Sequence, residues 1–198
     1  MTHETRESWL NAVAAGMAPL FEALDASLPD RVRVAIGFTS RGAKAKAIGE
    51  CWDNRLSADG HFEIFIRPDL AHAPDAMPAQ IAAILAHELV HAAVGIPAGH
   101  GKAFKRVALG LGLVGPMRAT TPGEAFLAAI APILEGVGPL PPCPSRYGRR
   151  VDRAQEAENP DAQMRVRDVR LYRQDRAQMA GTGRRAALPD RGAWGHGA

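Results

Sequence analysis

Hydrophobic residues in the first two thirds of the chain recur with two periods, and these periods predict both helices and strands. Over residues 6–25 the apolar side chains recur at steps of three and four, which is typical of an amphipathic helix. Three later segments are predicted to be strands, namely 31–38, 45–52 and 61–68. In the last of them Phe62, Ile64 and Ile66 fall on one face.

The pattern then changes to helical spacing. Residues 79–94 are predicted to form a central helix, which Gly95 and the proline after it end. A second helix is expected over about 101–112, and a third within 121–138, with Thr121 as its N-cap. The predicted order α-β-β-β-α-α-α is an α+β fold, with the helices concentrated after the sheet.

The predicted central helix carries the pattern HExxH, formed by His87, Glu88 and His91. Residues four apart lie on the same face of a helix, so His87 and His91 can direct two imidazoles at one ion. Glu88 can then reach a water molecule held by that ion and take its proton, as in zinc peptidases. The alternative is a helix whose histidines are hydrogen-bonded within the core and whose glutamate is a plain surface carboxylate.

A third ligand must come from elsewhere in the chain, because a catalytic zinc ion needs three protein ligands and one open position. His100 follows the end of the central helix within the stretch GIPAGHG, where the chain can turn back. It also opens the next helix, which Phe104 would anchor by packing. His72 is expected in a loop and His61 at the start of a strand, so His100 is the preferred ligand. The alternative for His100 is a histidine that only caps the helix.

Two stretches carry a specific resemblance to a known family. The segments GECWDNRLSADGHFEIFIRPDL and ILAHELVHAAVGIPAGHGKAFKRVALGLGL resemble the SprT-like metallopeptidases, most closely those of bacteria and phages. In that family the glutamate of HExxH is catalytic, and its two histidines bind zinc together with a histidine of a following His-Gly-x-x-Phe element. The resemblance therefore implies Zn²⁺ as the cofactor, His87, His91 and His100 as its ligands, and Glu88 as the catalytic residue.

The same resemblance implies a small zincin-like peptidase core and an endopeptidase that hydrolyses peptide bonds of a protein or peptide substrate. Better-known eukaryotic members cut proteins crosslinked to DNA, so DNA-associated substrates are expected. One alternative is a DNA-associated accessory protein whose zinc site is structural or inactive; Lys102, Lys105, Arg106 and the basic tail support it. A second alternative is a non-functional product of a damaged gene.

Composition divides the chain near residue 140. Residues 1–140 contain 12 Lys and Arg and 14 Asp and Glu, whereas residues 141–198 contain 12 Arg and 7 Asp and Glu. The second segment has no Ile, Phe or Lys, and such a composition cannot bury a core. We therefore expect a metallopeptidase domain over residues 1–140 and a disordered, arginine-rich tail over residues 141–198.

The tail also departs from the family pattern, because members commonly carry a zinc ribbon after the peptidase core. If the codons are read one base later, Met179 and the codon after it encode tryptophan, and Met164 followed by a CGN codon for Arg165 encodes cysteine. These residues fall where a ribbon would need them, which favours a slip of the reading frame near residues 138–140. A natural arginine-rich tail that binds nucleic acid or acidic partners is the alternative.

Three further features bear on location. No apolar run is long enough to span a bilayer, and the N-terminal residues lack a signal pattern. Cys51 and Cys143 are too few and too far apart for a disulfide framework. We therefore expect a cytoplasmic protein that does not bind a membrane, whereas its oligomeric state does not follow from the sequence.

Overall fold

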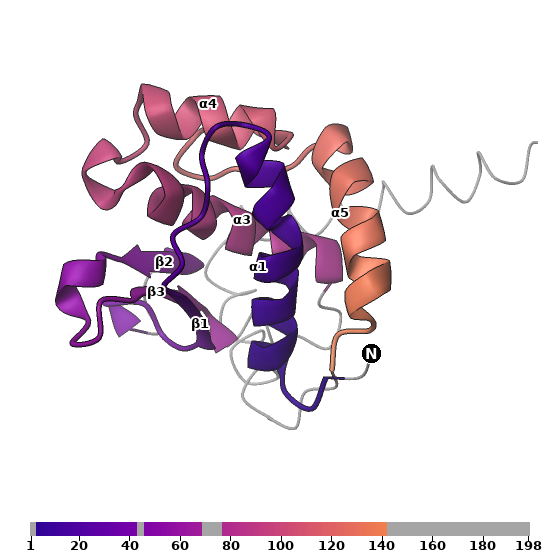
Figure 1. The fold of residues 1–198 in the computed structure, drawn as a ribbon, viewed down its shortest axis with the longest axis horizontal. Coiled ribbons are helices and arrows are strands. Elements are labelled where there is room, and N and C mark those ends of the chain that lie inside the picture. Colours follow the sequence, from indigo (N-terminus) through magenta and orange to yellow (C-terminus); the bar gives the residue numbers. More distant parts are fainter. Residues whose placement is uncertain (1–2, 43–45, 69–76, 142–198) are drawn as a thin grey trace, which may run out of the picture. The chain divides into compact units, whose positions relative to one another are not determined.

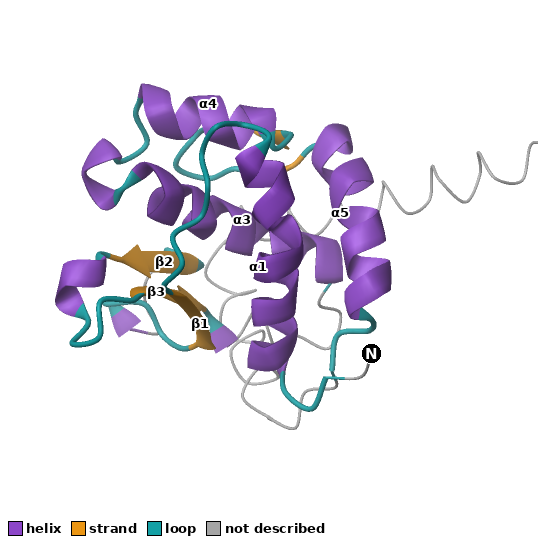
Figure 2. Cartoon of the chain, in the orientation of Figure 1, coloured by secondary structure: helices purple, strands orange, loops and turns teal. Residues whose placement is uncertain are grey.

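A computed structural model of the chain describes residues 3–42, 46–68 and 77–141. Every described residue lies in the first of two units, residues 1–152 and 153–198, into which the chain divides. Helices and a small sheet make up this part, which confirms the predicted α+β class (Figures 1 and 2). In chain order the elements are α1 (Arg6–Glu22), β1 (Val32–Ile36), β2 (Gly49–Trp52), η2 (Asn54–Leu56), β3 (Phe62–Ile66), α3 (Pro78–Val94), η3 (Ile96–Ala98), α4 (Lys102–Gly110), β4 (Leu113–Val114), β5 (Thr121–Pro122) and α5 (Glu124–Val137).

Helix α1 begins with a capping box and buries the face that its periodicity predicts. The Ser8 N–H donates to Thr5 Oγ1 (3.1 Å), and the Thr5 N–H donates to Ser8 Oγ (3.4 Å). The buried face includes Trp9, Leu10, Val13, Met17 and Phe21. The Trp9 indole N–H donates to Gly138 O (3.0 Å), so the first turn of α1 is tied to the end of α5.

Strand β3 lies in the middle of the three-stranded sheet, parallel to β1 and antiparallel to β2. The side chains of Val34, Ile64 and Ile66 are buried on the inner face of the sheet. Helix α3 packs against β2 and β3 and also against α1, α4 and α5. Because α3 contacts nearly every other element, side chains on it are held in fixed positions relative to the rest of this unit.

The two edges of the sheet differ. Helix α1 packs along β1, and Asn11 on α1 donates its side-chain N–H to Val34 O (3.2 Å). At the other edge, the Arg67 N–H donates to Ile48 O (3.1 Å). Since hydrogen-bonded and non-hydrogen-bonded pairs alternate along an antiparallel ladder, Gly49 and Cys51 of β2 direct their backbone N–H and C=O groups away from β3. Within the described residues no strand pairs with the outer edge of β2, and there the Cys51 backbone N–H is hydrogen-bonded to Glu88.

The predicted ends of α3 agree with the structure. The helix starts at Pro78, whose missing N–H costs nothing in the first turn. It ends at Gly95, which has a φ of 82°, a conformation that suits glycine. The short helix η3 then reverses the chain into α4, and Phe104, Val107, Ala108 and Leu111 are buried as predicted.

One prediction about the region before α5 was wrong, and one element there was not predicted. Thr121 is not the N-cap of this helix; Gly123 takes that position and makes no side-chain cap hydrogen bond. Thr121 instead lies in β5, which pairs with β4 in a small hairpin that the periodicity did not predict. The reason is that each strand has only two residues, too few to show an alternating pattern.

Some predictions fall outside the described residues. They concern His72, the start of the segment 45–52, the tail over residues 141–198 and its boundary at residue 140. Within the described part, β2 begins at Gly49. No described helix combines the length and the apolar composition that a membrane span requires.

Candidate metal centre

The structure brings His87, His91 and His100 together, although they come from two different segments. His87 and His91 lie one turn apart on α3, and His100 lies in the turn between η3 and α4. The Nε2 atom of His100 is 3.2 Å from Nε2 of His87 and 3.3 Å from Nε2 of His91. Within the described residues, these three form the one group of histidine, cysteine or acidic side chains spaced to hold a metal ion. We call them the histidine cluster.

The spacing of the three nitrogens fits a zinc ion. Ligands at about 2.0–2.1 Å from a tetrahedral zinc ion lie about 3.3–3.4 Å from one another, close to the two Nε2 separations of the histidine cluster. Three imidazoles also match the ligand types of zinc sites that keep one position open for water. The donor set and its geometry therefore fit such an ion.

Phe104 forms a common support for the histidine cluster. Its ring centroid lies 4.8 Å from that of His87, 4.5 Å from that of His91 and 4.8 Å from that of His100. The Phe104 side chain is fully buried in the core, so it cannot easily shift. This contact explains the spacing of His100 and Phe104 in the chain, since one turn of α4 places the phenyl ring beneath the imidazoles.

The histidines are held in the neutral form that binds metals. Burial, with a smaller effect of the neighbouring His100, lowers the pKa of His87 to about 4. Burial also lowers the pKa of His91 to about 3, with added effects of His87 and His100. The pKa of His100 is lowered as well, by burial and by the charge of Arg118. At neutral pH the cluster therefore presents uncharged imidazoles, whose unprotonated nitrogens are metal ligands.

Thr120 also contacts the site, and the sequence analysis missed it. Its Oγ1 atom lies 2.8 Å from Nδ1 of His87, the ring nitrogen on the far side from His100. The two residues are 33 positions apart in the chain. No motif singles out Thr120, because a threonine ahead of a helix is more simply explained as a cap.

Glu88 lies beside the histidine cluster in sequence, and its side chain is directed to β2. It is 6% exposed, and a Cβ atom added to Gly49 would lie 2.6 Å from its Oε1 atom. Burial and, to a smaller extent, the nearby charge of Glu50 raise the pKa of Glu88 to about 8, against the opposing effect of a hydrogen bond from the Cys51 backbone. A buried carboxyl at the free edge of β2 can exchange a proton near neutral pH.

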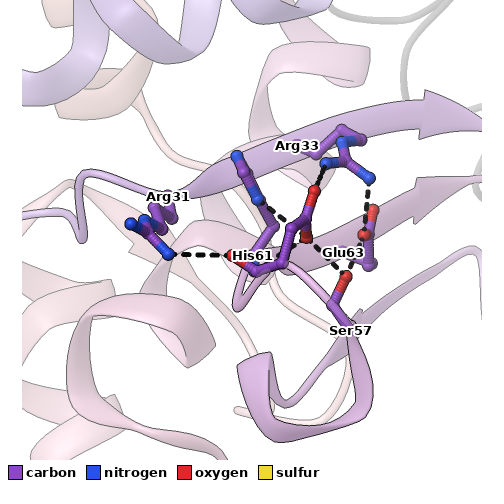
Figure 3. Close-up of polar contacts among 6 residues, drawn as sticks. Arg31, Arg33, Ser57, His61 and Glu63 are labelled. Atoms are coloured by element: carbon purple, nitrogen blue, oxygen red, sulfur yellow. Dashed lines mark hydrogen bonds and ion pairs between the residues drawn. The ribbon is translucent and has the colours of Figure 1, made fainter.

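The alternative ligand His61 lies in a different cluster. Its Nδ1 atom is 2.9 Å from a carboxylate oxygen of Asp59. Asp59 also accepts a hydrogen bond from Arg33, and Arg33 donates to Glu63 (3.0 Å). Figure 3 shows how these side chains join β1 to the turn before β3, with Ser57 completing the group. We call Arg33, Ser57, Asp59, His61 and Glu63 the arginine cluster.

Comparison with known proteins adds nothing to this description, since no family model, curated protein or solved structure matches the chain. The candidate site therefore rests on its own geometry. That geometry consists of three neutral imidazoles whose Nε2 atoms converge and one buried carboxyl on the same helix.

Proposed function

We propose that this protein is a zinc-dependent endopeptidase of the SprT-like kind. The observation that supports the proposal most strongly is the convergence of the Nε2 atoms of His87, His91 and His100, together with the buried Glu88 on the same helix as two of them. This combination is what hydrolysis of a peptide bond at neutral pH needs: ligands for a Lewis acid and a base that is protected from bulk water.

In the proposed mechanism the three histidines bind the ion through Nε2, and Phe104 keeps their rings in place. A zinc ion held there supplies the Lewis acidity that makes a water molecule reactive near neutral pH. Glu88 accepts the proton of the attacking water and later donates it to the leaving amine. The positive charge of the metal ion would lower the pKa of Glu88 from its raised value, towards the range of a base at neutral pH.

The free edge of β2 is the proposed binding surface for the substrate. Gly49 and Cys51 direct their backbone groups away from β3, as the alternation of the ladder requires. An extended peptide added along this edge would form hydrogen bonds with the backbone groups of Gly49 and with the Cys51 carbonyl, and it would lie next to Glu88, which accepts from the Cys51 N–H. Backbone pairing of this kind recognises an extended chain rather than a particular side chain, so unfolded segments are the expected substrates.

Proximity to DNA is a secondary part of the proposal, and α4 is the element that favours it. Lys102 and Lys105 are exposed on α4 directly after His100. Arg106 is less suited to contact DNA, because its guanidinium donates a hydrogen bond to Leu24 O (2.6 Å). A protein that binds DNA through these lysines but holds a silent zinc site is the competing function.

Replacement of Glu88 by Gln tests the proposal, because the amide keeps the shape of the side chain but cannot take a proton from water. The full-length variant should retain one zinc ion per chain and lose about 100-fold to 10,000-fold of its rate on an unfolded protein substrate. Glu135→Gln, an exposed substitution on α5, is the matched control and should cleave at the unaltered rate. Cleavage by Glu88→Gln at the unaltered rate would contradict the proposed mechanism, and a zinc-loaded wild type without hydrolytic activity would favour the silent site.

A further inference from the structure

Among the described residues, His87 is the one member of the histidine cluster whose Nδ1 atom has a hydrogen-bond partner. That partner is Thr120 Oγ1 at 2.8 Å. The other ring nitrogen of His87, Nε2, faces His100 Nε2 at 3.2 Å. Thr120 therefore contacts the ring at the atom opposite the one that faces the proposed metal position.

The backbone around Thr120 is fixed on both sides. Thr120 directly precedes β5, which pairs with β4 in the small hairpin. On the other side, the Ala119 N–H donates to Pro116 O (2.8 Å), which closes a tight turn. Leu113 anchors the hairpin with a fully buried side chain, and β5 packs against α3. The hydroxyl of Thr120 is thus presented to His87 by a rigid segment rather than by a flexible loop.

The direction of the hydrogen bond follows from the chemistry of a neutral imidazole. A neutral ring carries one proton, and only the unprotonated nitrogen can bind a metal ion. If Nε2 of His87 is the ligand atom, the proton must lie on Nδ1, and Nδ1–H then donates to Thr120 Oγ1. A hydroxyl accepts this bond without adding a negative charge, so it holds the ring while leaving the charge of the site unchanged.

We propose that Thr120 is a positioning residue, which selects the tautomer and the ring orientation of His87 that metal binding requires. The inference rests on the metal site of the proposed function, and it adds the β4–β5 hairpin to the parts of the fold that build this site. Outer-shell hydrogen bonds to metal-ligating histidines are typically worth about 10-fold to 100-fold in metal affinity. Because helix α3 fixes the backbone of His87, a loss of metal affinity of this size would result from rotation of the His87 ring alone.

Thr120→Val in the full-length protein is the decisive variant, because valine keeps the size and the branching of threonine but removes the hydroxyl. Thr121→Val is the matched control, since Thr121 is the exposed neighbour in β5. Thr120→Ser serves as a rescue, because serine keeps the hydroxyl. Zinc affinity is measured by competition with a chromophoric chelator, and far-UV circular dichroism confirms that each metal-free variant is folded.

We expect Thr120→Val to bind zinc about 10-fold to 100-fold more weakly than the wild type, while Thr121→Val is unchanged and Thr120→Ser recovers most of the loss. A second signal is specific to the hydrogen bond. In the zinc-loaded wild type, the Nδ1 proton of His87 should give a slowly exchanging imidazole NMR signal, which His87→Gln removes and Thr120→Val exposes to fast exchange.

Equal zinc affinities of the wild type, Thr120→Val and Thr121→Val would overturn the role of Thr120 and leave the proposed function intact. An equal loss in both valine variants would also overturn it, because the effect would then come from the hairpin and not from the hydroxyl. Failure of the unaltered protein to bind zinc would overturn both proposals together.

Discussion

The histidine cluster and the arginine cluster are both groups of polar side chains that join elements far apart in the chain. They differ in which groups face each other: opposite charges in the arginine cluster, and neutral nitrogens of one kind in the histidine cluster. In the arginine cluster, Arg33 contacts the carboxylates of Asp59 and Glu63, so each charge has a partner within the protein. In the histidine cluster, three nitrogens of the same kind face one another. The charged groups of the arginine cluster are paired with one another, whereas the nitrogens of the histidine cluster are spaced closely enough to bind a metal ion.

The two clusters also differ in their solvent exposure and in the side chains around them. The Arg33 and Asp59 side chains are about half exposed, at 47% and 51%, where water can replace any lost contact at little cost. The histidine cluster instead lies over the buried Phe104 and next to the buried Glu88. The three imidazoles are partly buried and their Nε2 atoms face one another, an arrangement that suits a bound cation, so we place the proposed function at the histidine cluster and a structural role at the arginine cluster.

Loss of one ligand should give the largest effect. His91→Ala should weaken zinc binding by more than about 100-fold, because outer-shell changes alone typically cost about 10-fold to 100-fold. His61→Ala removes a histidine from the arginine cluster and should leave zinc affinity unchanged. Zinc content after dialysis and a chelator titration measure both variants. Equal zinc loss in the two would remove the distinction between the clusters.

Displacement of Glu88 should give the next largest effect. In Gly49→Ala the new Cβ would lie 2.6 Å from Oε1 and 2.9 Å from Cγ of Glu88, so the carboxyl must move. A misplacement of about 1 Å in a catalytic group can cost about 100-fold in rate, and we expect a loss of this order with zinc retained. Gly136→Ala, where no atom lies within 4 Å of the added Cβ, is the control. Initial rates and zinc content are measured for both; an unaltered rate in Gly49→Ala would show that β2 does not position the carboxyl.

Acidification of the metal-free protein should separate the clusters by pH range. The pKa of His87 is about 4 and that of His91 about 3 in the folded protein, against an ordinary value of 6.5. The unfolded chain therefore binds more protons, and the free energy of unfolding should fall as the pH drops from about 6.5 towards 4. The hydrogen bond from Arg33 holds the pKa of Asp59 below its ordinary value of 3.8, so the contribution of Asp59 is lost only below that pH.

Denaturant unfolding between about pH 7 and pH 4 tests this prediction. The double variant His87→Gln, His91→Gln should show a flatter dependence on pH than the wild type, and Asp59→Asn should keep the wild-type slope over this range. A slope that stays the same in the double variant would show that the two imidazoles bind protons over the same pH range in the folded and in the unfolded protein.

Loss of a charge from the arginine cluster should give the smallest effect. Asp59→Asn removes an exposed ion pair with Arg33 and a polar contact with His61. Exposed pairs contribute little to stability, so we expect the Tm to fall by no more than about 2–4 °C and the zinc affinity to stay the same. Differential scanning calorimetry and the chelator titration are the measurements. A clear drop in zinc affinity would mean that the arginine cluster supports the metal centre.

The elements differ in how much of them the sequence predicts. The face of α1 that includes Trp9 and Met17 follows from helical spacing. The end of α3 follows from Gly95, which stops the helix, and its observed start at Pro78 lies within one residue of the predicted start. The role of Thr121 was predicted wrongly, because a threonine before a helix is a common cap and the two-residue strands of the β4–β5 hairpin leave no periodic signal. Short elements of this kind form only because α3 and α4 offer a surface for them to pack on.

For the candidate site, the sequence by itself determines the pair His87 and His91, because four residues along a helix always return to the same face. It also indicates His100 and Glu88 as their companions, since both lie close to the pair in the chain. Only the tertiary structure decides that Thr120 touches His87, that Gly49 leaves room for Glu88 and that β2 keeps a free edge beside them. These contacts join elements distant in the chain, 33 residues apart for Thr120 and His87, and are set by how the core packs rather than by any local pattern.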